Sequence, residues 1–490
     1  MWYDLATGSP SCEFPKGSGK HAGYLASLWT SASDDLGADY VTGQLYRTEG
    51  IDYWPGPLDA AGECSYATSE KWARIWKISQ TDIIAFKALS SRTVSTVPVD
   101  ILEWPAKGNI YAKGAGKAML SISEEMAPFV DVDADGIYDP IKGDYPQIKG
   151  DQMLWWIFND NGATHTSSKG TPLKLEYKTS AYAYSRGTEI DNVVYYEFNM
   201  TNKSKIRYVD FRFGLFSDAD LGNPFDDYIA FDSAHRMGIM YNGQLPDLNG
   251  KKSYGMHPPV VGISFINMPG DKYPHAMMPA GAFNYFENGL VGPLRDPRAA
   301  VEFKNYMHAK DADGIPRYFG NYAFEIKKGA VQCDSTYPFK DRRFVIATGN
   351  YNFQPNTNTI VAMALMATDT TGNACPKIDF KPITDLADEA WEVFYNPKPP
   401  LGVKEIQSLD KMLRVYPNPA SNYLFIDSYT GKELKAEMIK VFDMAGKEIK
   451  IAAMQNNKQI KIETSALTSG TYTLTYSENG LIASQQFTKR

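Results

Sequence analysis

Short segments rich in β-branched and aromatic residues dominate the central part of the chain. Residues 193–200 read VVYYEFNM, and residues 208–216 alternate apolar and polar side chains over part of their length. This period of two is typical of a strand with one buried face. Residues 343–347 and 360–367 are two further apolar runs, separated by the turn-rich sequence Gln354-Pro355-Asn356. We expect these two runs to pair in one sheet.

Helical periodicity is scarce by comparison. Residues 383–394 are the best candidate, because Ile383, Leu386, Ala390 and Val393 recur at helical spacing and Asn396-Pro397 would end the helix. Residues 70–77 could form one short helix. The pattern therefore predicts a mainly β protein, in which a large antiparallel β-rich body carries long loops and few short helices.

A Pro-rich segment, residues 396–402, divides the chain. We divide the sequence into a β-rich body of one or two subdomains at residues 1–395, a linker at residues 396–410 and a C-terminal domain at residues 411–490. Strand-like segments recur in the C-terminal domain with turns between them, as in a small Ig-like β-sandwich. These segments are residues 423–426, 438–442, 459–462, 471–476 and 484–487.

Charge narrows the range of functions. The chain has 50 Lys and Arg against 57 Asp and Glu, a net charge of −7, which argues against a nucleic-acid partner. The excess is uneven, with +4 on residues 411–490 and −11 on the remainder. The purest apolar run, residues 360–367, is far shorter than the ~20 residues that span a bilayer. We therefore expect no membrane span.

Motifs in the C-terminal domain carry a family resemblance. Val415-Tyr416-Pro417-Asn418-Pro419 comes first, Val441-Phe442-Asp443-Met444-Ala445-Gly446-Lys447 and Leu467-Thr468-Ser469-Gly470-Thr471-Tyr472 follow, and Lys489-Arg490 ends the chain. Together they closely resemble the type A C-terminal sorting domain of the type IX (Por) secretion system of Bacteroidetes. The resemblance implies contact with the type IX machinery and a secreted or outer-membrane cell-surface location.

The resemblance also implies a signal peptide for export through the inner membrane. Met1-Trp2-Tyr3-Asp4 has neither a basic start nor an apolar core, so we expect this numbering to begin after a trimmed N-terminus. In this family the sorting domain is often removed after export, which leaves retention or cleavage open here.

The body resembles a group of secreted proteins of the same bacteria without assigned chemistry, and this resemblance supplies no catalytic residues. It rests on four stretches of sequence. These are Trp54-Pro55-Gly56-Pro57-Leu58-Asp59, Gly143-Asp144-Tyr145-Pro146 with Gly150-Asp151-Gln152, Trp155-Trp156-Ile157-Phe158-Asn159-Asp160, and Asp341-Arg342-Arg343-Phe344.

The sharpest local signal is an acidic loop that begins at residue 131. Carboxylates stand at loop positions 1, 3, 5 and 9, glycine stands at position 6, and the carbonyl of position 7 could be a further ligand, as in a calcium loop. These residues are Asp131, Asp133, Asp135, Asp139, Gly136 and Ile137. Position 12 is Lys142 where an EF-hand has glutamate, and Asp144 could substitute. This favours a calcium loop outside a helix–loop–helix; the alternative is a solvated turn without an ion.

A second acidic cluster follows the strand predicted at residues 208–216. Five carboxylates there would repel one another unless a cation neutralises them, so we predict a metal site, with an exposed acidic loop as the alternative. The five are Asp218, Asp220, Asp226, Asp227 and Asp232. The shorter Asp311-Ala312-Asp313-Gly314 has fewer carboxylates, and we expect a plain turn there.

Catalytic signatures are lacking. The sequence has no GxSxG, HExxH or GxxxxGK[ST] pattern. A glycosidase needs a pair of carboxylates, but the sequence selects no pair. Trp54, Trp155 and Trp156 could stack on sugars or pack in a core. We therefore assign no catalytic residue and favour a protein that is not an enzyme.

The four cysteines of an exported chain meet an oxidising environment. We predict the disulfides Cys12–Cys64 and Cys333–Cys375, which join neighbours in sequence; other connectivities and free thiols are the alternatives. Overall, we expect a secreted or cell-surface structural or interaction protein that is calcium-stabilised and self-associates or binds other surface proteins. The alternative is a secreted polysaccharide hydrolase or a non-catalytic glycan-binding protein.

Overall fold

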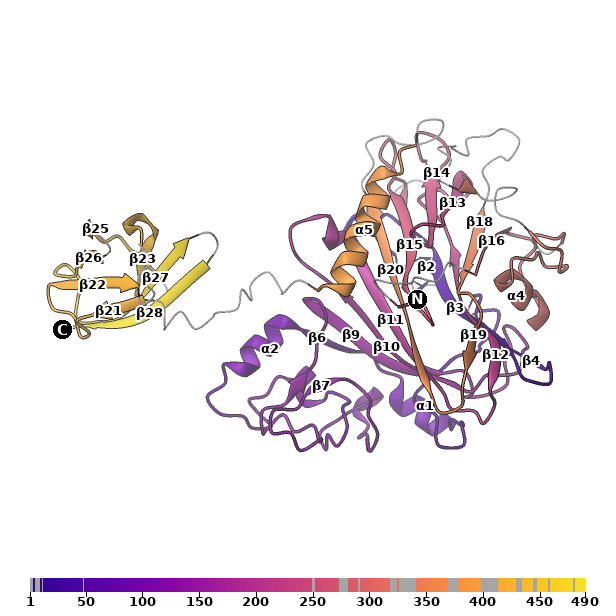
Figure 1. Ribbon diagram of the computed structural model, residues 1–490, viewed down its shortest axis with the longest axis horizontal. Helices are drawn as coiled ribbons and strands as arrows, with labels where there is room; N and C mark the ends of the chain where they lie inside the picture. The colour runs from indigo at the N-terminus through magenta and orange to yellow at the C-terminus, as the bar shows by residue number, and fades with distance from the viewer. Residues whose placement is uncertain are drawn as a thin grey trace. The chain divides into compact units, whose positions relative to one another are not determined.

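The chain divides into two compact units, Met1–Lys398 and Pro399–Arg490 (Figure 1). Both units are mainly β, and among the described residues nearly all of their strand pairs are antiparallel, which confirms the predicted mainly β fold. The computed structural model describes residues 3–4, 9–10, 12–46, 48–248, 252–272, 281–289, 291–317, 324–325, 341–368, 378–397, 413–428, 434–443, 447–456, 459–478 and 481–490. Within these residues, no helix is both long and apolar enough to cross a membrane.

The body contains a ten-stranded sheet. Its strands run in the order β17-β13-β14-β15-β20-β11-β10-β9-β5, and β6 also pairs with β9. Their bounds are β5 (Trp54–Pro55), β6 (Trp76–Ser79), β9 (Gln152–Asn159), β10 (Leu175–Ala183), β11 (Val193–Asn202), β13 (Asp227–Asp232), β14 (Met237–Asn242), β15 (Val260–Asn267), β17 (Phe324–Glu325) and β20 (Asn358–Thr368).

A six-stranded sheet packs against one face of the larger sheet. Its order is β16-β18-β12-β3-β4, and β19 pairs with β12. The bounds are β3 (Leu25–Ser33), β4 (Asp39–Gly43), β12 (Tyr208–Asp218), β16 (Ala282–Glu287), β18 (Arg342–Ala347) and β19 (Tyr351–Phe353). The prediction that residues 343–347 and 360–367 pair is wrong, because β18 pairs with β12 and β16 while β20 lies between β15 and β11 in the larger sheet.

Alternation along each strand explains the core. Phe198 and Met200 of β11 face the smaller sheet and pack with Phe213 of β12, whereas Val193 and Tyr195 face the opposite side. The larger sheet is therefore buried on both faces over much of its area, so its strands read as apolar runs. This is why the sequence reveals that these segments are strands but leaves their partners open.

Helices and loops cover the outer faces of the two sheets. Helix α5 (Lys381–Tyr395) packs on the larger sheet beside β20 and β15 (Figure 1), and buries Ile383, Leu386, Ala390 and Val393 as predicted. Residues 66–150 cover the rest of that face with α1 (Tyr66–Trp72), α2 (Gln80–Lys87), α3 (Val99–Leu102), β7 (Phe129–Val130) and β8 (Tyr145–Pro146). Helix α4 (Ala300–Met307) packs on the smaller sheet, and β1 (Tyr3–Asp4) pairs with β2 (Ser9–Pro10).

The helix predicted at residues 70–77 is wrong in its second half. Helix α1 ends at Trp72. Trp76 and Ile78 belong to β6, and both side chains are buried in the hydrophobic core that also contains Trp155. Pairing with β9 provides a partner for the β6 backbone, and the Trp76 ring lies 5.7 Å from that of Trp155. Tertiary packing thus overrides a weak local helical preference.

The C-terminal unit is a sandwich of two four-stranded sheets, as predicted. One sheet is β21 (Leu413–Tyr416), β22 (Tyr423–Ser428), β26 (Gln459–Glu463) and β25 (Ala453–Asn456) in that order. The other is β24 (Glu448–Ile449), β23 (Ile439–Phe442), β27 (Gly470–Glu478) and β28 (Leu481–Lys489). Leu424, Ile460, Val441 and Leu474 meet in the core between the two sheets.

The predicted Cys12–Cys64 disulfide is absent, and both side chains are free thiols. The two residues lie in different surroundings: Cys12 packs against the core between the sheets, and the Cys64 Sγ lies 3.8 Å from the carbonyl oxygen of Pro55. Burial raises the pKa of Cys12 to about 12, so this thiol stays protonated. Cys333 and Cys375, the other predicted pair, lie outside the described residues.

Candidate cation-binding sites

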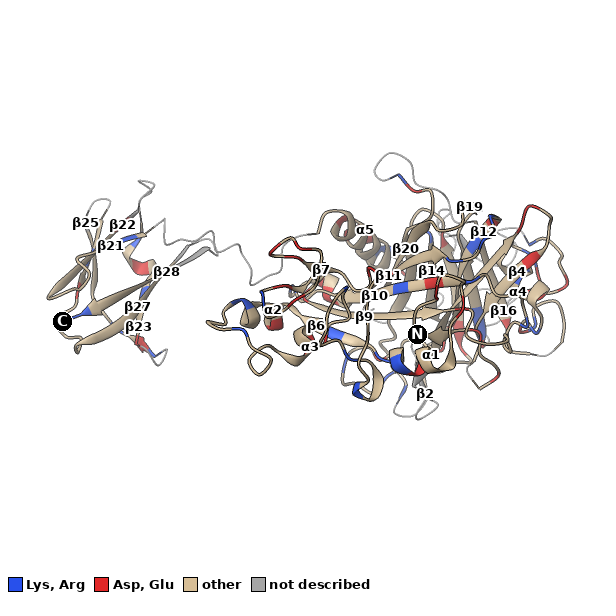
Figure 2. Cartoon of the chain, turned by 90° about the horizontal axis from the view of Figure 1, so that it is seen from below, with Lys and Arg blue, Asp and Glu red and all other residues tan. Residues whose placement is uncertain are grey.

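The acidic loop of residues 131–144 is closed by a two-stranded ladder. Strand β7 precedes it and β8 follows it, and Val130 pairs with Tyr145. Gly136 has a φ of 78°, the left-handed conformation that glycine adopts at low cost. Strands rather than helices flank the loop, and Figure 2 shows the acidic residues that follow β7. The loop thus has the fixed ends that a ligand-binding turn needs.

Carboxylates hold this loop in its turn by accepting backbone hydrogen bonds. Asp144 is fully buried, and its two oxygens accept the N–H groups of Val132 and Asp139, each at 2.8 Å. Asp131 Oδ2 accepts the N–H of Gly136 at 2.8 Å. Burial raises the pKa of Asp144, and the backbone hydrogen bonds oppose this effect. The loop conformation therefore depends on groups that could also bind a cation.

Three of the predicted ligands converge. One carboxylate oxygen each from Asp131, Asp133 and Asp144 lies within 4.8 Å of the others. Ligands of one calcium ion lie about 2.3–2.6 Å from it, so two of them are separated by at most about 5 Å. Asp131 Oδ1 is buried and has no hydrogen-bond partner. This oxygen is available to a cation.

The remaining predicted ligands lie elsewhere in the loop. Asp135 Oδ1 accepts the N–H of Ile137 at 2.9 Å, and Asp139 Oδ1 accepts the N–H of Ile141 at 2.9 Å. Asp135, Ile137 and Asp139 are not part of the converging group. Their side chains and backbone shape the turn around it.

Lys142 places a positive charge inside the loop. Its Nζ lies 2.7 Å from Asp135 Oδ2 and 3.3 Å from Asp133 Oδ2. The ammonium lowers the pKa of Asp135, and the two carboxylates raise the pKa of Lys142. Since Lys142 is half-exposed, it can leave Asp133 when a cation binds. The lysine would thus compete with any cation for this carboxylate.

Sheet register assembles a second acidic group on the smaller sheet. Asp218 ends β12 and is paired with Arg343 of β18, and Asp341 immediately precedes β18. One oxygen each from Asp218, Asp220 and Asp341 lies within 4.8 Å of the others. Only Asp218 and Asp220 of this group were predicted from the sequence.

Arg343 lies at the centre of this group. Its Nε donates to the Tyr46 hydroxyl at 2.7 Å, and that hydroxyl donates to Asp218 Oδ2 at 2.6 Å. Arg343 Nη1 lies 3.3 Å from Asp341 Oδ1, and Nε lies 3.5 Å from Asp218 Oδ1 and 3.8 Å from Asp296 Oδ1. These three carboxylate oxygens are buried and accept no hydrogen bond. The single positive charge of Arg343 thus lies close to three carboxylates.

Burial raises the pKa values of Asp218 and Asp220, and repulsion by neighbouring carboxylates adds to the effect. Burial, with the neighbouring carboxylates, raises the pKa of Asp220 to about 8. Burial also raises the pKa of Asp218 to about 6, although Arg343 opposes the shift. The group therefore retains protons near neutral pH unless a cation replaces them.

Asp226 and Asp227 form a third group with Asp247. Asp227 Oδ2 accepts the N–H of Leu221 at 2.9 Å, while its Oδ1 is buried without a hydrogen-bond partner. Asp247 accepts the N–H groups of Asn223 and Tyr254 at 3.0 and 2.6 Å. Burial, followed by the charge of Asp247, raises the pKa of Asp226 to about 6. These carboxylates mainly fold the loop that follows β12.

Asp232 and Asp311 make contacts that stabilise the fold around them. Asp232 Oδ2 lies 2.5 Å from His235 Nδ1, and His235 Nε2 lies 3.0 Å from Asp388 of α5. Asp311 Oδ1 accepts the N–H groups of Asp313 and Ile315, each at 3.0 Å. The five carboxylates at residues 218–232 are thus divided among three neighbourhoods.

We expect His235→Gln to destabilise the protein below about pH 6.5 and to have little effect at pH 9. The hydrogen bond that the His235 imidazolium donates to Asp232 is the main cause that raises the pKa of His235. Its stabilisation is therefore complete below the unfolded pKa of ~6.5 and is lost as pH rises through the folded pKa. The loss at pH 6 should be on the order of 1 kcal/mol. Urea unfolding at pH 6 and pH 9 measures it.

His257 is exposed, so His257→Gln is the matched control and should leave the free energy of unfolding unchanged at both pH values. An equal loss for His235→Gln at pH 6 and pH 9 would contradict the charge-based interpretation.

Sequence reasoning missed Tyr46, Asp247, Asp296, Asp341 and Arg343. Asp341 and Arg343 lie in one of the stretches that resemble other secreted proteins, and this resemblance is the only sequence feature that points to them. Nothing in the local sequence marks Asp296 or Tyr46. The fold brings these residues to Asp218 from far along the chain.

The C-terminal unit matches a known family. Residues 414–490 match the family described as a secretion system C-terminal sorting domain. The C-terminal unit is thus a type IX sorting domain of the kind found in Bacteroidetes, and the protein is exported to the cell surface or the extracellular space. This confirms the predicted sorting domain, its location and its contact with the type IX machinery.

Comparisons of the whole chain with known proteins identify no function for the body. No curated protein matches it. A polysaccharide lyase structure is 8% identical over 76% of this chain and 38% of its own, with a TM-score of 0.21. A protein assigned as a kojibiose phosphorylase from human microbiome is 6% identical over 78% of this chain and 34% of its own, with a TM-score of 0.25. The chain spans less than two-fifths of either protein, and these scores assign neither fold nor activity.

Proposed function

We propose that the exported body is a non-enzymatic interaction protein of the cell surface that calcium stabilises. The observation that carries this proposal is the convergence of Asp131, Asp133 and Asp144, whose oxygens lie within 4.8 Å of one another. The unpartnered Asp131 Oδ1 supports it further. A cation bound there would tie together the two ends of the loop.

The donor set favours calcium among common cations. The loop offers only oxygen ligands, which suit hard cations rather than zinc or copper. Magnesium demands near-ideal octahedral geometry and dehydrates reluctantly, whereas calcium accepts irregular sets of six to eight oxygens. Extracellular modules bind calcium with Kd values of about 10⁻⁴–10⁻³ M. An exported protein with a lysine beside the site fits this weak class.

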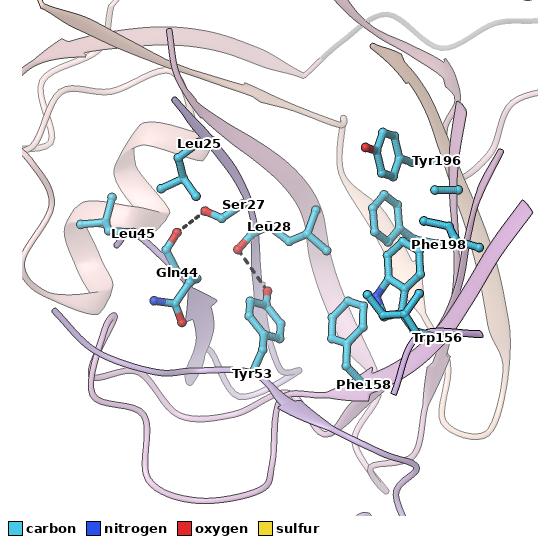
Figure 3. A pocket seen from close by; sticks show the side chains of 13 residues that line it. Leu25, Ser27, Leu28, Gln44, Leu45, Tyr53, Trp156, Phe158, Tyr196 and Phe198 are labelled. Atoms are coloured by element: carbon cyan, nitrogen blue, oxygen red, sulfur yellow. Dashed lines mark hydrogen bonds between the residues drawn. The ribbon is translucent and has the colours of Figure 1, made fainter. Parts of the chain in front are cut away.

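The engagement of the carboxylates supports a role other than catalysis. Those of the 131–144 loop accept backbone hydrogen bonds or contact Lys142. Among the residues that the structure describes, no carboxylate lines the cavity of about 390 Å³ between the two sheets (Figure 3). A polysaccharide hydrolase needs two acids facing a substrate cleft. Self-association and binding to other surface proteins stay predictions.

We expect calcium at 5 mM to raise the melting temperature of the body by about 1–3 °C, and EGTA to reverse the change. A ligand that binds only the folded state stabilises it by RT ln(1 + [L]/Kd), about 1–2 kcal/mol for a Kd near 10⁻⁴–10⁻³ M. Thermal unfolding followed by circular dichroism measures the shift. An identical melting curve with calcium and with EGTA would reject the proposal.

Lys142→Glu is the matched variant for this experiment. It removes the competing ammonium and supplies a carboxylate at loop position 12, so the calcium Kd should fall at least tenfold. Lys107→Glu, a partly buried lysine paired with Glu125 outside the loop, should leave the calcium Kd unchanged. Magnesium at the same concentration should shift the melting temperature less than calcium does.

A further inference from the structure

The second acidic group, formed by Asp218, Asp220 and Asp341, shares no residue with the 131–144 loop. Each of the three carboxylates offers one oxygen, and these oxygens lie within 4.8 Å of one another. The group lies where β12 ends and β18 begins, two neighbouring strands of the smaller sheet (Figure 1). Strand pairing thus brings together carboxylates from two distant segments of the chain.

Two carboxylates of this group, and that of the neighbouring Asp296, accept hydrogen bonds through one oxygen only. Asp218 Oδ2 accepts the Tyr46 hydroxyl at 2.6 Å, and Asp341 Oδ2 accepts a side-chain amide N–H at 2.9 Å. Asp296 Oδ2 accepts a backbone N–H at 3.2 Å. In all three residues Oδ1 is buried and accepts no hydrogen bond. The side chain of Asp218 is only 3% exposed, so its free oxygen has no ready access to bulk water.

Arg343 lies beside these free oxygens without satisfying them. Its Nη1 lies 3.3 Å from Asp341 Oδ1, and its Nε lies 3.5 Å from Asp218 Oδ1 and 3.8 Å from Asp296 Oδ1. An arginine that closed this group would donate charge-assisted hydrogen bonds of about 2.7–2.9 Å. Instead Nε donates to the Tyr46 hydroxyl, and Nη1 has no hydrogen-bond partner. The three free oxygens therefore face one place and lack a donor there.

The charges in this place do not balance. Four carboxylates, those of Asp218, Asp220, Asp296 and Asp341, lie around the single guanidinium of Arg343. Among the described residues, no other basic side chain forms an ion pair with any of them. Burial of a charge is costly unless it is paired. Water could donate hydrogen bonds to the free oxygens but would leave the negative charge uncompensated, whereas a divalent cation would compensate most of it.

We propose that the second acidic group binds a calcium ion, with Asp218, Asp220 and Asp341 as its carboxylate ligands and Asp296 beside them. The donors are all oxygens, which suit a hard cation, and ligands of one calcium ion are separated by at most about 5 Å. Asp220 and Asp341 are only partly buried, so the ion can enter from solvent and keep water ligands. The ion would tie the end of β12 to the start of β18. This site holds whether or not the 131–144 loop binds calcium.

Isothermal titration calorimetry of the full chain with calcium chloride at pH 8 tests the proposal. Asp133→Ala is the background, because it removes a ligand of the loop site, and we expect this variant still to bind one calcium ion. Asp341→Asn and Asp220→Asn keep the side-chain shape and remove the charge, and each should weaken this binding at least tenfold. Asp385→Asn, an exposed carboxylate of α5 paired with Lys381, is the control and should leave the affinity within twofold.

Circular dichroism shows whether each variant keeps the fold of the parent. Asp220 is partly exposed and lies outside the strands, so Asp220→Asn tests the site even if Asp341→Asn fails to fold. The proposal is overturned if the Asp133→Ala protein binds no calcium at 10 mM. It is also overturned if Asp220→Asn, and Asp341→Asn where it folds, bind calcium as tightly as the Asp133→Ala background does.

Discussion

Asp144→Ala is expected to lower the free energy of unfolding by about 2–4 kcal/mol, and calcium should not restore it. Asp144 is fully buried and accepts the N–H groups of both Val132 and Asp139. Its loss leaves two backbone donors without an acceptor, each of which costs about 1–3 kcal/mol. It also removes one of the three converging oxygens. Urea unfolding with calcium and with EGTA measures both effects.

Asp133→Ala separates the structural role of the loop from ligand binding. Asp133 is exposed and forms an ion pair with Lys142 within the loop, and such a pair contributes little to stability at an exposed position. This variant should match the parent in EGTA and lose the calcium-induced stabilisation that the loop provides. If Asp144→Ala instead unfolds like the parent in EGTA, the backbone hydrogen bonds are not what holds the loop.

How far the sequence can predict a site depends on where its ligands lie along the chain. The 131–144 loop was predictable because Asp131, Asp133 and Asp144 belong to one turn, and the pattern of carboxylates and glycine is local. The group around Arg343 was only half predictable. Asp218 and Asp220 stand together in the sequence, but Asp341 reaches them through the pairing of β12 with β18. Register of this kind has no local signature.

The same distinction applies to the fold. Strands β11, β12 and β20 and helix α5 were predicted because local patterning is strong in each of them. The partners of β18 and β20 were not predictable, since both strands are buried over most of their length and lack the alternation that would mark a face. Strand β6 was not predicted from the sequence, because residues 76–79 form a strand by pairing with the distant β9.

The largest electrostatic effect is expected for Arg343→Gln, which should lower the free energy of unfolding by about 3–5 kcal/mol at pH 8. Arg343 is buried, and its guanidinium faces buried oxygens of Asp218, Asp296 and Asp341. Glutamine keeps a donor group but removes the charge. The carboxylates would then be left without the cation that offsets their burial.

The loss caused by Arg343→Gln should shrink at pH 5. The folded pKa values of Asp218 and Asp220, about 6 and about 8, lie above the unfolded value of ~3.9. The folded state therefore binds protons that the unfolded state releases, and stability falls as pH rises from about 4 to about 8. Removing Arg343 raises these pKa values further and steepens the fall. Urea unfolding at pH 5 and pH 8 measures the difference.

Arg343→Gln combined with Asp218→Asn completes the test. The second substitution removes one of the uncompensated carboxylates, so at pH 8 the double variant should be more stable than Arg343→Gln alone. A divalent cation that occupied the group of Asp218, Asp220 and Asp341 should also stabilise the single variant at pH 8, because it would replace the missing counter-charge of Arg343. A loss equal at pH 5 and pH 8, with no recovery in the double variant, would mean that Arg343 acts through packing on Tyr46 and that these carboxylates need no counter-charge.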